Sequence, residues 1–352
     1  MTSKIEIYPE RLKELREIAG YMPEDVAKKL RIPLNKFLRI EKDGKVTPAQ
    51  LKKLAKLYRM PTAAFFSEKI PKIEIPVDYR INRDRKFTPE VFVAIRRAKY
   101  LLEQIKEISQ KRSNIPEIST ENPKITAKEL RKYIGIEIAK NKSAREIYEY
   151  YKEKIEEKLN VLVMEYPLSD DVRGFSIYSD LSAIVLNESD DYPIKLFSLF
   201  HELAHLIRRE SGICSVELEQ EEKVEKFCNE FSAEFLVPEE KLMEEVKSKR
   251  LEEEKEVKKI AKKFGVSVQV IMLRLLSQRL ISSERYKEFK EKFKKDKIIK
   301  KGRKDWEKTY INRCGNFAIS EVSRAYKNGE ITFYEAMRIL DLNSKYAERI
   351  LG

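Results

Sequence analysis

Apolar residues recur at helical spacing throughout residues 1–67 of the chain. The recurrence falls into five short runs. Only three residues, Arg31–Pro33, separate the second run from the third, as in a helix-turn-helix. The pattern therefore predicts a five-helix helix-turn-helix domain over residues 1–67. The predicted helices are Arg11–Ala19, Pro23–Leu30, Leu34–Glu41, Pro48–Tyr58 and Pro61–Phe66.

The pattern changes at residues 68–88, where Ile70-Pro71 and Ile75-Pro76 predict an extended linker. Helical spacing then resumes, and the run from Pro193 to Ile207 is apolar on most faces, as expected of a helix buried in a core. The organisation that follows is a linker at 68–88, a second domain at 89–280, and a basic linker with a helical tail at 281–352. Further helices are predicted over Thr88–Arg112, Ala127–Tyr133, Ser143–Leu159, Glu221–Leu236, Val257–Phe264 and Val268–Gln278.

The only two histidines of the chain lie four residues apart in the apolar helix, in Phe200-His201-Glu202-Leu203-Ala204-His205. This H-E-x-x-H spacing puts both imidazoles on one face of a helix with a carboxylate beside them. Polar groups in so apolar a helix are costly to bury unless they are paired or bound to metal. We therefore predict that His201 and His205 hold a divalent cation, with Zn²⁺ preferred for these ligand types. The alternative is that both histidines are ordinary core or surface residues.

A catalytic zinc centre needs a third protein ligand, and with no other histidine it must be Asp, Glu or Cys. Glu225 lies on the flank of the apolar stripe of the predicted helix Glu221–Leu236, so it could complete the site. Asn229, one turn later, could form a hydrogen bond with a ligand histidine without itself binding the metal. Other candidates for the ligand are Glu221, Glu222, Glu230 and Cys228, of which Cys228 is more typical of a small buried residue.

The segments F-H-E-L-A-H-L at 200–206 and E-K-F-C-N-E-F-S-A-E-F-L-V-P at 225–238 resemble the ImmA/IrrE-type metallopeptidases. In the second segment Cys228 and Ser232 stand at the two alanine positions of the family pattern E-x-x-A-N-x-F-A-x-x-L-L-x-P. The resemblance implies Glu225 as the third ligand and a small sheet before the active helix. The strands of that sheet would be Val161–Val163, Gly174–Ile177 and Ala183–Asn187.

This resemblance implies a cytosolic zinc-dependent endopeptidase that cleaves a repressor or antitoxin to control transcription, often with a repressor-type DNA-binding domain. Zn²⁺ on His201, His205 and Glu225 would activate water, and Glu202 would serve as general base. The strand Ala183–Asn187 is expected to hold an extended peptide by strand addition. Tyr178, Tyr192 and Arg173 all stay open as the residue that stabilises the oxyanion.

The N-terminal run V-A-K-K-L-R-I-P, with its neighbours, resembles the Xre/Cro-type repressor family. The fold class expected for the whole chain is therefore α+β and mostly helical. It would have a helix-turn-helix domain, a zincin-like domain with a small sheet and the H-E-x-x-H helix, and a helical C-terminal region. The alternative function is a DNA-binding transcriptional regulator or antitoxin whose metal site is sensory, structural or vestigial.

Charge supports a nucleic-acid partner for the N-terminal domain. Residues 1–67 carry 15 Lys+Arg against 8 Asp+Glu, which contributes +7 to the chain's net charge of +13. A basic surface attracts the phosphate backbone of DNA. Asn35, Lys36 and Arg39 would face the major groove from the third helix. A helical module that binds protein is the alternative, because Pro23 and Arg31 replace the usual Gln and Gly of the repressor pattern.

Composition indicates a cytoplasmic protein. Cys214, Cys228 and Cys314 are too few and too scattered for a disulfide framework. The sequence shows no signal peptide and no apolar run of about eighteen residues, so we expect neither secretion nor a membrane partner. Whether the chain forms a homodimer stays open.

Overall fold

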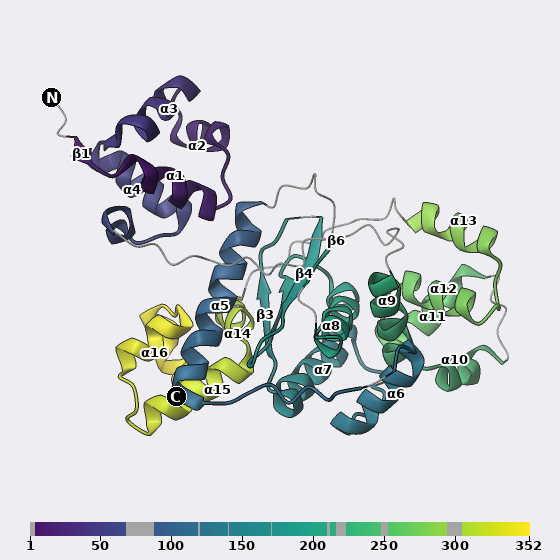
Figure 1. Ribbon diagram of the computed structural model, residues 1–352. Coiled ribbons are helices and arrows are strands. Elements are labelled where there is room, and N and C mark those ends of the chain that lie inside the picture. The colour runs from purple at the N-terminus through teal and green to yellow at the C-terminus, as the bar shows by residue number, and fades with distance from the viewer. Residues whose placement is uncertain are drawn as a thin grey trace. The chain divides into compact units, whose positions relative to one another are not determined.

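The computed structural model describes residues 4–67, 88–118, 120–139, 141–169, 171–209, 212–215, 223–247, 253–293 and 305–352 (Figure 1). Contacts divide the chain into two units, one ending at Arg97 and the other beginning at Ala98. The division falls within the helix α5, Pro89–Ser109, which is three residues shorter than the predicted Thr88–Arg112 helix at its C-terminal end. The predicted linker lies outside the described residues, except for Thr88, so the functional domain ranges stay a prediction. None of the described helices is both long enough and apolar enough to span a bilayer.

The N-terminal unit contains helices at the predicted positions together with a small antiparallel sheet that the apolar pattern did not indicate. Its core is formed by buried side chains such as Leu15, Val26, Phe37, Leu54 and Phe65. The last predicted helix is a short 3-10 helix. The elements are β1 (Ile5–Glu6), α1 (Pro9–Ile18), α2 (Pro23–Leu30), α3 (Leu34–Asp43), β2 (Lys45–Val46), α4 (Pro48–Tyr58) and η1 (Thr62–Phe66).

The turn between α2 and α3 depends on Arg31. Its φ of 58° and ψ of 46° are left-handed, and its backbone N–H closes α2 by donating to the carbonyl oxygen of Lys28. A side chain with a Cβ strains this conformation, and glycine is the usual residue there. The tight connection predicted from the sequence therefore forms, with the backbone of Arg31 in a strained left-handed conformation.

The second unit is organised around a four-stranded sheet of order β3-β5-β4-β6. Strand β5 pairs in parallel with β3 on one side and antiparallel with β4 on the other, and β4 also pairs antiparallel with β6. The expectation that Ala183–Asn187 holds a peptide by strand addition is therefore wrong. A central strand has both edges occupied, so its backbone groups cannot pair with a further strand. The strands are β3 (Leu162–Tyr166), β4 (Val172–Ile177), β5 (Ala183–Asn187) and β6 (Gly212–Ser215).

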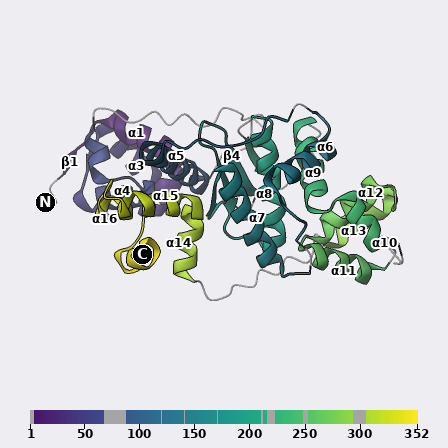
Figure 2. The same cartoon turned by 90° about the horizontal axis from the view of Figure 1, so that it is seen from below.

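Helices cover both sides of this sheet, as Figures 1 and 2 show. On one side α8 packs along α9 and α7, and its residues share a continuous core with Val163, Ile184 and Leu186 of the strands. On the other side α14 and α15 contact β3. The helices are α6 (Pro123–Ile134), α7 (Ala144–Leu159), α8 (Tyr192–Ile207), α9 (Lys223–Leu236), α10 (Glu239–Val246), α11 (Glu254–Phe264), α12 (Val268–Ser277), α13 (Ser283–Phe293), α14 (Trp306–Cys314), α15 (Asn316–Lys327), α16 (Phe333–Leu340) and α17 (Ser344–Leu351).

The C-terminal helices are anchored to the sheet by a buried carboxylate. Glu156 on α7 accepts the backbone N–H groups of Asn316 and Phe317, each at 3.3 Å, at the start of α15. Gly315, with φ of +79°, permits this approach, because a Cβ there would lie 2.7 Å from Oε1 of Glu156. The helical tail predicted from the sequence is thus packed against β3 and α7. The basic linker predicted from residue 281 begins with a helix, α13, and residues 294–304 lie outside the described residues.

Candidate metal centre

Helix α8 presents the two histidines from within the core. Asp191 precedes its first residue and Pro193 lies in its first turn, where a missing N–H costs no hydrogen bond. The ring of Phe200 stacks on Phe235 of α9 with centroids 4.1 Å apart and meets Tyr151 of α7 edge to face at 5.2 Å. These aromatic contacts fix the rotation and depth of α8, so they also fix the directions of the neighbouring polar residues.

Three predicted ligands converge at the contact between α8 and α9. His201 Nε2 lies 3.3 Å from His205 Nε2, although the two residues are on successive turns. The Glu225 carboxylate spans the pair, with Oε2 at 3.2 Å from His201 Nε2 and Oε1 at 3.4 Å from His205 Nε2. Burial raises the pKa of Glu225, but its contacts with the two imidazoles outweigh that and leave the pKa below its usual range.

This triangle of donor atoms fits a zinc ion. Ligands bound at 2.0–2.1 Å in a tetrahedral arrangement lie about 3.3 Å from one another. The 3.3 Å between the two imidazole nitrogens matches that edge length, and each nitrogen has one oxygen of the Glu225 carboxylate beside it, at 3.2 Å for His201 and 3.4 Å for His205. Two imidazoles and one carboxylate are also the donor set of a known class of catalytic zinc centres, which keep a fourth position for water. The residues present therefore fit the metal that the sequence implied.

Asn229 lies where a supporting residue is needed. Its Oδ1 is 3.0 Å from Nδ1 of His201, one turn after Glu225 on α9. An acceptor at Nδ1 holds the proton on that nitrogen and leaves the lone pair of Nε2 directed at the metal position. The histidine is thus oriented for metal binding by a residue that does not itself reach the metal.

Glu202 is fully buried and faces the sheet rather than α9. Gly174 of β4 makes the room, because a Cβ there would lie 3.4 Å from Cγ of Glu202 and 2.9 Å from the Val185 carbonyl oxygen. Among the described residues no hydrogen bond of good geometry reaches either Glu202 carboxylate oxygen, although the Ser176 hydroxyl of β4 lies close enough to lower the pKa of Glu202. Burial raises the pKa of Glu202 to about 8, although the nearby His205 opposes the shift. A buried carboxylate without hydrogen bonds is costly, and such groups mark sites that bind a ligand or move a proton.

Cys228 has a closer relation to the histidines than the sequence suggested. It is buried, as predicted, but its Sγ and one nitrogen of each of His201 and His205 all lie within 4.8 Å of one another. The signal was its spacing, since a residue three after Glu225 lies on the same side of a helix. Glu230 is exposed, and the rivals Glu221 and Glu222 lie outside the described residues.

The candidates for oxyanion stabilisation have other contacts. Arg173 forms an ion pair with Asp190, and the Tyr192 ring packs on Tyr148 with centroids 5.7 Å apart. Tyr178 is 38% exposed. The choice among the three therefore stays open.

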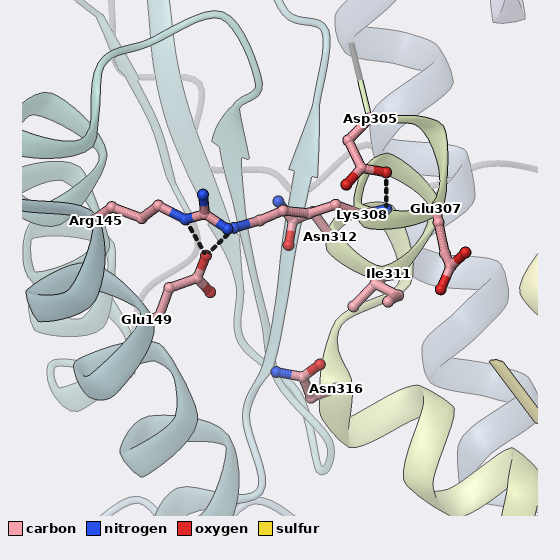
Figure 3. Close-up of a pocket in the computed structure, with 8 residues that line it drawn as sticks. All are labelled: Arg145, Glu149, Asp305, Glu307, Lys308, Ile311, Asn312 and Asn316. Atoms are coloured by element: carbon pink, nitrogen blue, oxygen red, sulfur yellow. Dashed lines mark hydrogen bonds and ion pairs between the residues drawn. The ribbon is translucent and has the colours of Figure 1, made fainter. Parts of the chain in front are cut away.

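A separate surface hollow of about 470 Å³ lies between α7 and α14 (Figure 3). Opposite charges meet across it, with Lys308 Nζ 2.6 Å from Oε1 of Glu149, while Arg145 lies 4.0 Å from the same carboxylate. Its lining includes neither histidine. Because its charged side chains are largely paired with one another, this hollow is a weaker candidate for a functional site than the cluster at α8 and α9.

Comparison with known families supports the same region. Residues 156–276 match the family model Peptidase_M78, described as the IrrE N-terminal-like domain. This segment is therefore similar to a metallopeptidase-type domain. The match runs from the end of α7 through the sheet, α8 and α9 to α12, and it includes all of the residues that converge on the metal position. No curated protein matches the chain.

The N-terminal unit lies outside the Peptidase_M78 match. Asn35, Lys36 and Arg39 are all exposed on α3, as the helix-turn-helix prediction requires. The Asn35 side chain accepts the backbone N–H of Lys36 at 2.7 Å, so it is engaged within its own helix. DNA binding by this unit stays a prediction.

Proposed function

We propose that the chain is a cytoplasmic zinc-dependent endopeptidase with an N-terminal DNA-binding domain. The observation that supports the peptidase activity most strongly is the triangle of His201, His205 and Glu225 beside the buried Glu202. When bound, Zn²⁺ would act as a Lewis acid that lowers the pKa of a water ligand and polarises the scissile carbonyl. All other steps belong to side chains of the protein.

Glu202 is the proposed general base. A carboxylate oxygen of Glu202 would take a proton from the attacking water and later pass it to the nitrogen of the leaving amine. Such an exchange works best when the pKa of the group lies near the operating pH, and burial moves the pKa of Glu202 in that direction. Its oxygens form no hydrogen bond of good geometry with a described residue, so they can accept the proton of a water.

An extended peptide would have to add at an edge of the sheet rather than at β5. Strand β6 follows α8 in the chain and has one pairing partner, β4, among the described strands. Main-chain hydrogen bonds along a free edge would hold any sequence in an extended form. We propose the edge of β6 as the place where the substrate backbone lies.

The proposed substrate is a repressor or antitoxin, and cleavage would switch transcription. This part rests on the resemblance of residues 200–206 and 225–238 to the ImmA/IrrE-type family and on the basic N-terminal unit. The rival is a DNA-binding regulator or antitoxin whose metal serves sensing or structure. Glu202 favours the enzyme, because a purely structural metal centre does not need a buried, unpaired carboxylate.

The test combines metal analysis with proteolysis. Purified protein should contain about one zinc per chain, and His201→Ala should lose it. Repressors encoded near the gene should be cleaved by the wild type and not by Glu202→Gln, which should keep its zinc. Metal retention without cleavage in both proteins, across such partners, would favour the rival. A wild type that binds no divalent metal would overturn the proposal.

DNA binding is tested independently by footprinting on the protein's own promoter over a series of salt concentrations. Arg39→Ala should weaken the footprint more than Lys52→Ala, which removes the same charge from an exposed position on α4. The affinity of the wild type should fall steeply as salt rises. Equal footprints for both variants, or retention that does not depend on salt, would contradict the assignment of α3.

A further inference from the structure

Cys228 occupies the flank of Glu225 opposite to Asn229. On α9 these residues lie three and four positions after Glu225, so they point to either side of it toward α8. Asn229 reaches Nδ1 of His201 at 3.0 Å. The Cys228 thiol reaches the same pair of histidines from the other side, with its sulfur and one ring nitrogen of each histidine within 4.8 Å of one another.

The distances allow sulfur to join the metal. A tetrahedral zinc with one thiolate at about 2.3 Å and imidazoles at about 2.0–2.1 Å separates sulfur from nitrogen by about 3.6 Å. The sulfur therefore has to approach the histidine nitrogens by no more than about 1.2 Å, a movement that rotation about the Cα–Cβ bond can supply. Cys228 forms no disulfide and is completely buried, so no solvent competes with a metal for its thiolate.

We propose that Cys228 is a fourth ligand of the metal and closes the centre in its resting state. The proposal deepens the proposed function, and it rests on that function for the identity of the metal site. A centre with four protein ligands is of the structural kind, whereas hydrolysis needs one position for water. The resting protein is then latent.

Opening the centre exchanges one bond for another. The metal–sulfur bond would break, a water would take the vacated position, and a proton from that water would pass to the released thiolate of Cys228 to make a thiol. Glu202 is unaffected by this exchange in its place against Gly174 and stays ready as the base. The fully buried carboxylate of Glu202 is the second feature that points to chemistry at this position.

The experiment uses the full chain, freed of metal and loaded with Co²⁺ or Zn²⁺. The Co²⁺ form of the wild type should show a near-ultraviolet thiolate-to-metal charge-transfer band, and Cys228→Ala should lose it. Cys314→Ala and Cys214→Ala are matched controls that should keep the band. X-ray absorption of the Zn²⁺ form should show one sulfur at about 2.3 Å in the wild type and only nitrogen and oxygen in Cys228→Ala.

Two further measurements sharpen the result. Cys228→Ala should bind zinc more weakly than the wild type by more than the roughly 10–100-fold that loss of an outer partner costs. At saturating zinc the same variant should cleave substrate faster, because its centre is open. If Glu225→Ala bound zinc as tightly as the wild type, sulfur would replace that carboxylate, and the four-ligand centre would be wrong.

The two proposals fail in different ways. A wild type that binds one metal ion but shows no sulfur signal overturns the role of Cys228 and leaves the peptidase proposal standing. A wild type and variants that all fail to bind metal overturn both. Cys228→Ser, which keeps the side-chain volume, should behave as Cys228→Ala does, so a folding defect in the alanine variant would not decide the outcome.

Discussion

Replacing Asn229 by leucine should weaken zinc binding without unfolding the protein. Asn229 Oδ1 lies 3.0 Å from Nδ1 of His201, and that contact keeps the proton off the nitrogen that faces Glu225 and His205. Leucine has a similar volume but no acceptor, so the imidazole could rotate or take its other tautomer. Outer partners of metal-bound histidines typically contribute a factor of about 10–100 in metal affinity. At 1.4 kcal/mol per factor of ten, this is a loss of about 1.4–2.8 kcal/mol.

Zinc dissociation constants from competition with a chromophoric chelator measure this loss directly. Asn229→Asp keeps an acceptor and should bind zinc about as tightly as the wild type. Asn328→Leu is the control, because it removes an exposed amide at the end of α15 whose Nδ2 donates to Glu330. With only two histidines in the chain, nitrogen NMR of the metal-free protein can also report the tautomer of His201. A folded Asn229→Leu protein with the zinc affinity of the wild type would refute the reasoning.

Three further changes test other parts of the structure. In metal-free protein, Glu202 has a pKa raised from 4.5 to about 8, so its ionisation costs stability as pH rises through that window. Between those pH values the free energy of unfolding of the wild type, measured in urea, should fall by up to about 5 kcal/mol relative to that of Glu202→Gln, at 1.36 kcal/mol per pKa unit. Parallel pH profiles of the two proteins would contradict this. Arg31→Gly should relieve the strain of the left-handed backbone and stabilise the N-terminal unit by about 0.5–1 kcal/mol. Hydrogen exchange in α2 and α3 should then be slower, and unchanged or faster exchange would contradict the prediction. Gly174→Ala would place a methyl group 2.9 Å from the Val185 carbonyl oxygen. This close contact should lower the free energy of unfolding by about 1–3 kcal/mol. An unchanged melting temperature would show that β4 can move.

Local spacing predicted the parts of the site that belong to single helices. The four-residue interval of His201 and His205 puts them on one face of α8, and the same interval relates Glu225 to Asn229 on α9. The apolar character of residues 193–207 predicted that the helix is buried, and the mostly helical fold was also expected. These features follow from helix geometry, which a sequence carries in its periodicity.

Features that depend on distant segments were missed. Strand β5 became the centre of the sheet because β3 and β4 pair with its two edges, and no pattern within residues 183–187 specifies those neighbours. Gly174 lies against Glu202 although the two residues belong to different elements, and only the packed structure brings them together. The short pairing of β1 with β2 likewise joins segments on either side of three helices.

The anchoring of α15 by Glu156 has a consequence for how the protein is made. The acceptor and the backbone group of Asn316 are 160 residues apart along the chain. During synthesis the ribosome therefore completes α8 and α9 well before the helices that cover β3 emerge. Until they do, an apolar flank of the sheet stays open to water and to other nascent chains. A shortened product that keeps both histidines should for this reason be prone to aggregate, and it would make a poor substitute for the whole protein in any assay of proteolysis.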